Sequence, residues 1–170
     1  MRFLFCIAIL FCFCVLASNA QKDSIAAKNL VFLEFLGSGG YGSINYERLL
    51  SNKENLSVGL RAGLSTYHIN DYTHSFNPDL IFPLSVQCYY GRNHHLELGL
   101  GQTISAVVRA DPESFSPERE YKSSSTFCAG YRYQKPGGGI SFRLVYNPIL
   151  EFNSDFLHWV GVSIGYAFKD

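Results

Sequence analysis

The stretch LSVGLRAGL, residues 56–64, decides the fold because its side chains alternate in character from one residue to the next. One set is oily and consists of Leu56, Val58, Leu60, Ala62 and Leu64. The intervening set is small or polar and consists of Ser57, Gly59, Arg61 and Gly63. Successive side chains of a β-strand point to opposite faces. The stretch therefore predicts a strand with one oily face and one glycine-rich, sparsely charged face.

The same alternation recurs in five later segments. They cover residues 80–90, 96–108, 127–133, 140–147 and 160–168. If the chain turns at the GSGG sequence of 37–40, residues 30–50 form two strands, near 30–36 and 41–50. If it does not turn there, these residues form one bent strand. Single-chain bacterial barrels have even strand numbers, which favours the turn and a total of eight strands.

The oily faces could point inward, as in a soluble sandwich or a soluble periplasmic carrier barrel, or outward into lipid. A water-exposed strand face usually carries many Lys, Glu and Asp, but the second face here carries mostly Gly, Ser and Thr. Strands of about nine to eleven residues also match a tilted membrane crossing. We therefore expect an all-β, eight-stranded antiparallel up-and-down transmembrane β-barrel over residues 30–170, located in the cell outer membrane of a Gram-negative bacterium.

The lengths of the connections agree with this topology, since outer-membrane barrels have short periplasmic turns and longer external loops. Short turns are expected at 51–55, 91–95 and 134–138, and longer external segments at 67–77, 109–122 and 150–157. Only the first external connection, at 37–40, is short.

The first 20 residues have the layout of a secretory signal peptide. Arg2 precedes an apolar run of about 14 residues, and the segment ends on the small-residue sequence ASNA at 17–20. We predict cleavage after Ala20, with residues 21–29 as a short lead into the barrel. Lipid attachment is disfavoured because Cys6, Cys12 and Cys14 each follow Phe.

After cleavage the chain has 13 Lys and Arg against 14 Asp and Glu, a net charge of about −1 that gives no electrostatic case for nucleic acid. The two remaining cysteines, Cys88 and Cys128, lie on strands two apart with opposite facings, which disfavours a disulfide. No Cys or His grouping has metal-ligand spacing. We expect neither a metal nor a cofactor.

Six charged residues are assigned to the inward face of the barrel. They are Glu34, Glu47, Glu97, Arg61, Arg132 and Arg143. Because a buried charge is costly unless it is paired, we predict an interior salt-bridge network, mostly in the periplasmic half. The network either fills the lumen and fixes strand register or gates a narrow pore.

Aromatic residues near the strand ends are expected to form the interfacial girdles of the barrel. They are Tyr46, Tyr67, Tyr90, Tyr133, Tyr146, Trp159, Tyr166 and Phe168. The alternative is that aromatic residues simply favour strands.

Other motifs carry weaker functional signals. Residues 37–42, GSGGYG, match a nucleotide-binding glycine pattern, but no helical period follows, so a tight turn is expected. His68, Asp71, His74 and Ser75 share an external loop and leave open a small lipid-modifying enzyme. His94 and His95 are expected on a solvated turn. The charged loop 109–122 is the first choice for contact with an external partner.

The chain resembles the eight-stranded OmpA/OmpX-type outer-membrane barrels and other proteins with an outer-membrane β-barrel domain. The resemblance covers residues 29–170 and rests on the architecture, the opening GYGSINYER at 40–48 and the ending GVSIGYAF at 161–168. It implies a monomer with outer-membrane lipids and, during biogenesis, the outer-membrane insertion machinery as partners. Such families end on an aromatic residue that this machinery reads. Here Lys169 and Asp170 follow Phe168.

Overall fold

The computed structural model describes residues 26–53, 55–111, 115–151 and 156–170. Within these residues the chain forms one antiparallel sheet of ten strand segments. Their bounds are β1 Asn29–Gly37, β2 Gly40–Lys53, β3 Leu56–Ser65, β4 Leu80–Gly91, β5 His94–Ala110, β6 Pro117–Tyr133, β7 Gly139–Tyr146, β8 Ile149–Glu151, β9 Phe156–Leu157 and β10 Val160–Phe168. No helix in this part of the chain is long and apolar enough to cross a membrane.

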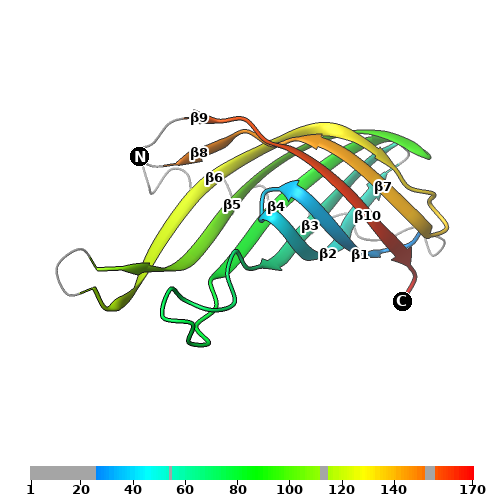
Figure 1. Ribbon diagram of the computed structural model, residues 1–170. Helices are drawn as coiled ribbons and strands as arrows, with labels where there is room; N and C mark the ends of the chain where they lie inside the picture. The colour runs from blue at the N-terminus through cyan, green and yellow to red at the C-terminus, as the bar shows by residue number, and fades with distance from the viewer. Residues whose placement is uncertain (1–25, 54, 112–114, 152–155) are drawn as a thin grey trace.

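The sheet closes on itself. β1 pairs with β2 on one side and with β10 on the other, in a register that runs from Asn29 opposite Phe168 to Phe35 opposite Val162. Figure 1 shows β1 in blue beside β10 in red. β7 and β8 are successive parts of one barrel strand, as are β9 and β10, so the described segments form eight strands in up-and-down order. The predicted fold class is confirmed.

The turn expected at 37–40 separates the first two strands. Gly37 lies opposite Gly40, and Gly40 has a φ of 85°, a left-handed conformation that glycine adopts without steric cost. Leu36 also lies in the left-handed region, with a φ of 55°. The glycine-rich segment is therefore the tip of a β-hairpin, which accounts for its composition without a nucleotide.

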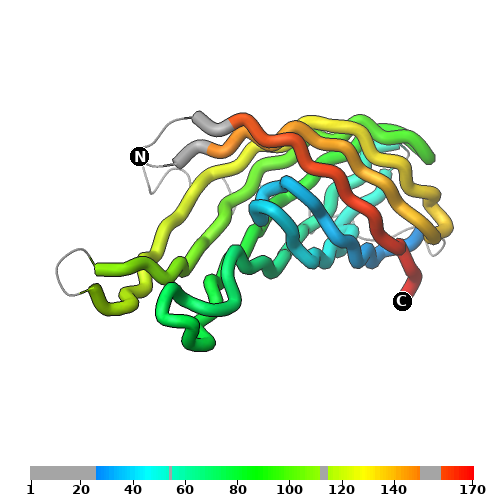
Figure 2. The backbone as a smooth tube through the Cα atoms, viewed as in Figure 1, coloured from blue at the N-terminus to red at the C-terminus, as the bar shows by residue number. Residues whose placement is uncertain are grey.

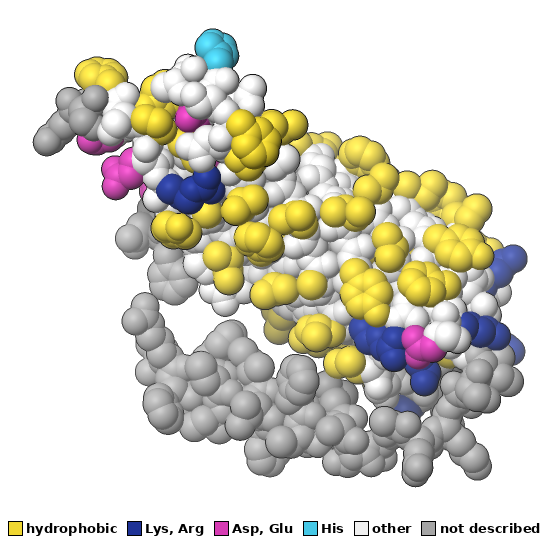
Figure 3. Space-filling view, turned by 90° about the horizontal axis from the view of Figure 1, so that it is seen from below, with side chains coloured by type: hydrophobic (Ala, Val, Ile, Leu, Met, Phe, Trp, Pro, Cys, Tyr) yellow, Lys and Arg dark blue, Asp and Glu magenta, His cyan; other side chains and the backbone are white. Residues whose placement is uncertain are grey.

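The oily faces point outward. Hydrophobic side chains cover the barrel surface that is in view in Figure 3, and Leu60, Leu98 and Leu144 are among the exposed ones. The residues between them are buried inside the barrel, as are Arg61, Glu97 and Arg143. The soluble alternatives required the opposite facing and are wrong.

Two residues of the predicted oily faces are buried. Val58 and Ala106 are each 8% exposed, although their neighbours Leu60 and Ile104 on the same faces are exposed. Ala106 pairs with Leu80 and Tyr121, whose larger side chains flank its single methyl group. Ala106 is thus covered by its cross-strand neighbours.

The connections group at two ends of the barrel. The turn end holds the short connections that follow β2, β4 and β6, with Asn55 and residues 92–93 and 134–138, and the loop end holds residues 38–39 and 66–79 and the described residues 111, 115 and 116 that follow β5. Cys88 is exposed and Cys128 is buried, so the two cysteines have the opposite facings that were expected.

The expected loop 109–122 is largely a strand hairpin, and that prediction is wrong. β5 runs to Ala110 and β6 begins at Pro117, with Ala110 opposite Pro117. The hairpin projects beyond the other strands (Figure 2). In the expected loop 150–157, Ile149 and Leu157 pair through their backbones, and 152–155 lie outside the described residues. The predicted signal peptide, with its three cysteines, also lies outside them.

Candidate functional site

The structure brings the six inward charges together in the lumen. Each comes from a different strand: Glu34 from β1, Glu47 from β2, Arg61 from β3, Glu97 from β5, Arg132 from β6 and Arg143 from β7. All six side chains are at most 2% exposed. Alternation along each strand sets the inward direction, and barrel closure sets which side chains meet.

Arg132 joins two carboxylates near one end of the network. Its Nη1 and Nη2 donate to Oε1 and Oε2 of Glu47 at 2.6 and 2.7 Å, a bidentate pair. Its Nε donates to Oε2 of Glu97 at 2.7 Å, and Nη1 also reaches Oε1 of Gln134 at 3.2 Å. The planar guanidinium suits this fork geometry.

The chain of charges continues across the lumen through Arg143. Arg143 donates to both oxygens of Glu97, with Nε at 3.1 Å from Oε2, and its Nη1 lies 3.5 Å from Oε1 of Glu34. Glu34 in turn accepts from both Nη atoms of Arg61, with Nη1 at 3.1 Å. Carboxylates and guanidinium groups therefore alternate in the order Glu47, Arg132, Glu97, Arg143, Glu34, Arg61, and their formal charges cancel.

Neutral side chains complete the network. Oδ1 of Asn45 accepts from Nε and Nη2 of Arg61 at 3.0 and 2.9 Å. The ring of Phe32 lies between Arg61 and Arg143, with its centroid 5.0 and 4.9 Å from their guanidinium carbons. Tyr89 faces Arg132 at 4.3 Å. Cation–π contacts of this kind stabilise desolvated guanidinium groups.

His95 was expected on a solvated turn, and that prediction is wrong. It is the second residue of β5, is 6% exposed, and faces the lumen two residues before Glu97. Its Nε2 lies 3.1 Å from the carbonyl oxygen of Gln134, and its ring meets Tyr89 edge-on at 5.3 Å. His94 is exposed, as expected, and its Nδ1 lies 2.5 Å from the hydroxyl of Tyr131.

The lumen has two parts of different composition. We call the part that holds the six charges the ionic half, and the part toward the loop end the neutral half. A cavity of about 10 Å³, room for about one water molecule, lies where the two halves meet, because Arg61 of the ionic half lines it together with residues of the neutral half. Its lining residues are Ser38, Arg61, Ser85, Gln87, Gly99, Leu100, Gly101, Thr126, Cys128 and Asn147.

The four loop residues considered for catalysis do not form a nucleophile, base and orienting group. Nδ1 of His68 lies 3.0 Å from Oδ2 of Asp79, whereas Oγ of Ser75 bonds Oγ1 of Thr73 at 3.1 Å. Asp71 accepts from the hydroxyl of Thr73 at 2.6 Å, a bond that lowers the pKa of the Asp71 carboxyl. Among the described contacts none joins Ser75 to His68 or His74, so the arrangement is that of a folded turn.

This loop is fixed to the β5–β6 hairpin by residues that the sequence reasoning missed. Buried Asp79 accepts from the backbone N–H of Val108 at 2.8 Å. Arg119 donates to Oδ1 of Asn77 at 2.5 Å and to the carbonyl oxygen of Pro78 at 3.1 Å. The NPD turn sequence at 77–79 is a signal that could have identified this brace. We call the loop 66–79 together with Phe115 of the β5–β6 hairpin the external pad.

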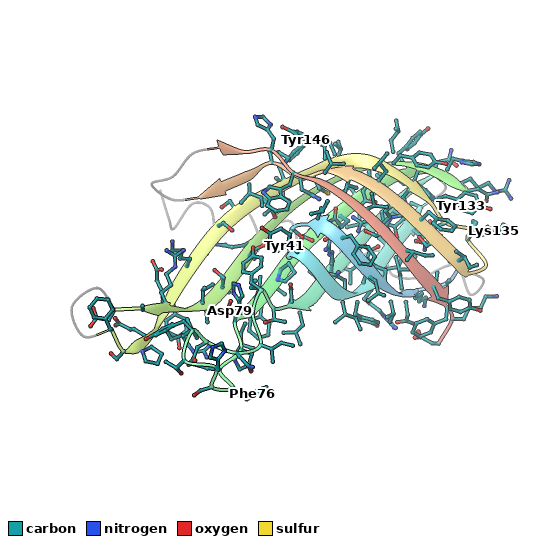
Figure 4. All side chains as sticks on the ribbon, viewed as in Figure 1. Tyr41, Phe76, Asp79, Tyr133, Lys135 and Tyr146 are labelled. Carbon is teal, nitrogen blue, oxygen red and sulfur yellow. The ribbon has the colours of Figure 1, made fainter. Side chains whose placement is uncertain are left out.

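The eight predicted interfacial aromatics fall into two groups. Tyr46, Tyr90, Tyr133, Tyr166 and Phe168 lie toward the turn end, and Tyr67, Tyr146 and Trp159 lie at the loop end. Six are exposed, and Tyr133 and Trp159 are half-buried. At the loop end, the ring of Tyr41 contacts those of Tyr67 and Trp159 at 5.7 and 5.9 Å. Figure 4 labels Tyr133 at the turn end and Tyr146 farther toward the loop end.

Comparison with known proteins gives a likeness of structure alone. No protein-family model and no curated protein matches the chain. The crystal structure of the N-terminal β-barrel domain of Pseudomonas aeruginosa OprF matches with a TM-score of 0.57 and 11% identity, over 86% of this chain and 100% of that one. The Yersinia pestis outer-membrane protein Ail in a phospholipid bilayer nanodisc matches with a TM-score of 0.51 and 11% identity, over 84% and 99%. This chain therefore has the fold of the small eight-stranded outer-membrane β-barrels.

Proposed function

We propose that this protein is a monomeric, non-enzymatic outer-membrane barrel whose lumen is closed by the ionic half and whose loop end offers a surface for interaction. The observation that carries the proposal is the chain of six alternating charges, which spans the lumen from Glu47 on β2 to Arg61 on β3 by way of β6, β5, β7 and β1.

The ionic half closes the lumen because its side chains are large, paired and held from several strands. Removing one member of a buried pair leaves an uncompensated charge, at a cost of about 3–5 kcal/mol. The network therefore resists both slippage of the strands and displacement of any one side chain. The neighbouring cavity, of about 10 Å³, is smaller than a hydrated ion needs. These features favour a plug over a gated pore.

Planar-bilayer recordings test the closure. We expect wild type to give no conductance steps, because no charged side chain can leave its partners cheaply. The variant Glu97→Ala/Arg132→Ala removes two opposite charges and two long side chains together, so it should conduct in small steps. Leu98→Ala, which shortens an outward side chain next to Glu97, is the control and should stay silent. Frequent steps in the wild type would contradict the proposal and favour the pore.

The external pad supports an interaction role because it is braced and exposes aromatic side chains. Asp79 and Arg119 hold the loop against the hairpin, and the hydroxyl of Tyr72 donates to the carbonyl oxygen of Phe115 at 2.7 Å. Phe76 and Phe115 nevertheless remain 79% and 77% exposed. Figure 4 shows Phe76 on the loop, away from the barrel wall.

A cell-binding assay tests the interaction role. Cells that produce the wild-type barrel should bind to surfaces that cells without it do not bind, and Phe76→Ser/Phe115→Ser should lose that difference. The control is Thr66→Ser, a conservative change in the loop 66–79. If the double variant bound as well as the wild type, the external pad would be excluded as the interaction surface.

A further inference from the structure

The turn end of the barrel carries a net positive charge, in contrast to the loop end. The described charged side chains at the turn end are Lys28, Arg48, Lys53, Arg92, Lys135 and Lys169 against the single carboxylate of Asp170. Those at the loop end are Arg109, Arg119 and Lys122 against Asp71, Asp79, Asp111, Glu118 and Glu120. Figure 3 shows Lys and Arg side chains gathered at the turn end, just outside the hydrophobic surface.

The positive side chains follow the turn-end aromatics at a short and repeated spacing. Arg48 follows Tyr46, Arg92 follows Tyr90, and Lys135 follows Tyr133, each by two residues. Lys169 directly follows Phe168 at the end of β10. Figure 4 places Tyr133 and Lys135 together at this end of the barrel. The loop-end aromatics Tyr67, Tyr146 and Trp159 have no Lys or Arg within two residues.

This order matches the order of chemical groups at the edge of a bilayer. Tyr side chains sit where hydrocarbon meets headgroups, and the longer Lys and Arg side chains extend outward from that level to the phosphates. Each cation near an anionic lipid surface strengthens binding by about fivefold. An aromatic residue followed by a cationic residue can therefore contact one lipid twice, with the ring against the acyl chain and the cation at the phosphate.

Two of these cations are well placed to bind a headgroup. Arg92 and Lys135 are exposed and lie in turns that follow β4 and β6. Arg48 is less suited, because its Nη1 and Nη2 donate to the Asp170 carboxylate at 2.6 and 3.0 Å. Arg48 and Asp170 instead tie β2 to the chain end that follows β10.

We propose that the turn end is a binding surface for anionic glycerophospholipids, with Arg92 and Lys135 as its principal headgroup contacts beneath Tyr90 and Tyr133. The inference rests on the proposed membrane-spanning barrel and adds the lipid class that surrounds one of its rims. The turn end then faces the leaflet that contains phosphatidylglycerol. The acidic loop end faces the other side.

Electron spin resonance of spin-labelled lipids tests this directly. The mature protein is reconstituted in phosphatidylcholine vesicles with a trace of spin-labelled phosphatidylglycerol or phosphatidylcholine, and the motionally restricted fraction gives the relative association constant. Wild type should prefer phosphatidylglycerol severalfold in about 0.1 M salt and lose most of the preference in about 1 M salt, because the screening length falls from about 10 to about 3 Å.

Matched variants separate a local site from net charge. Arg92→Gln/Lys135→Gln should bring the preference close to that for phosphatidylcholine. Arg109→Gln/Lys122→Gln removes two exposed cations from the loop end and should retain the wild-type preference. Equal loss in both double variants, or no preference in wild type, would overturn the proposal while leaving the barrel intact.

Two other results would overturn it for different reasons. In the first, both lipid labels associate equally, and the protein co-sediments with cell-wall sacculi unless it carries Arg92→Gln/Lys135→Gln. This result would show that the turn end binds the cell-wall polymer instead of lipid. The absence of a motionally restricted component with either label would show that the chain does not span the bilayer, and would overturn the proposed function as well.

Discussion

The two halves of the lumen solve the same packing problem with different side chains. The ionic half uses six long charged residues, each bound to partners on other strands. The neutral half uses Ser, Thr, Gln, Asn and Gly, and a cavity of about 10 Å³ remains where it meets Arg61 of the ionic half. Paired charges hold the strands in register, but when one charged side chain is removed its partner stays buried without compensation, which is costly. Removing a small polar side chain leaves no buried charge behind, so the neutral half is constrained mainly by the space available for side chains.

The largest effect is expected in the ionic half. Arg132→Met leaves Glu47 buried without its bidentate partner and should lower the free energy of unfolding by about 3–5 kcal/mol. Urea titration in phospholipid vesicles, followed by fluorescence of Trp159, the single tryptophan, measures it. Adding Glu47→Gln should restore part of the loss, because the stranded charge is removed. A loss below about 1 kcal/mol would show that the network contributes little.

A smaller effect is expected from crowding the neutral half. A Cβ at Gly101 would lie 2.6 Å from the carbonyl oxygen of Leu84 and from Cβ of Ser85. Gly101→Ala should therefore lower the free energy of unfolding by about 1–3 kcal/mol. Gly42→Ala is the matched control, since nothing lies within 4 Å of its added Cβ. Similar values for the two variants would mean that space does not limit this half.

Removing a single hydrogen bond from the neutral half should have a smaller effect still. Oγ1 of Thr103 donates to the carbonyl oxygen of Ser38 at 3.0 Å, which links β5 to the first hairpin tip. Thr103→Val keeps the shape and should cost about 0.5–1.5 kcal/mol in the same titration. A cost as large as that of Arg132→Met would erase the difference between the halves.

The smallest effect on stability is expected from protonation of Asp71 in the loop 66–79, which lies outside both halves of the lumen. The hydrogen bond from Thr73 lowers the pKa of Asp71 below its ordinary 3.8. The turn is therefore fully stabilised above pH 3.8 and loses this support as the pH falls through the lowered pKa. The amide resonances of Thr73 and Ser75 should shift together in that acid range, and Asp71→Asn should abolish the shift. Coincident changes in barrel resonances would mean that loop and lumen are coupled.

The facing of the barrel residues could be predicted from the sequence because each strand has only two faces. Alternation assigned Glu97 and Arg143 to the inside once Leu98 and Leu144 were assigned to the outside. The pairing of charges could not be predicted in this way. Arg132 meets Glu47, which is 85 residues away in the chain, and such a contact depends on register and closure around the whole barrel.

The two errors in the strands have related causes. The same alternation would have placed His95 inside with Glu97 if β5 had been started at His94, but the glycine and polar residues of 91–95 favoured a turn. The paired residues 109–110 and 117–122 extend beyond the other strands, where side chains on both faces are largely exposed. Charged residues can then occupy both faces, so the oily alternation that reveals the other strands is absent.

The direction of the oily faces is the claim on which the account depends, and nuclear Overhauser effects in phospholipid nanodiscs test it most directly. The methyl groups of Leu60 and Leu98 should show strong effects to lipid acyl chains, because both side chains lie on the outer surface. Effects from these methyls to lumen residues such as Arg61 and Glu97, with none to lipid, would contradict it.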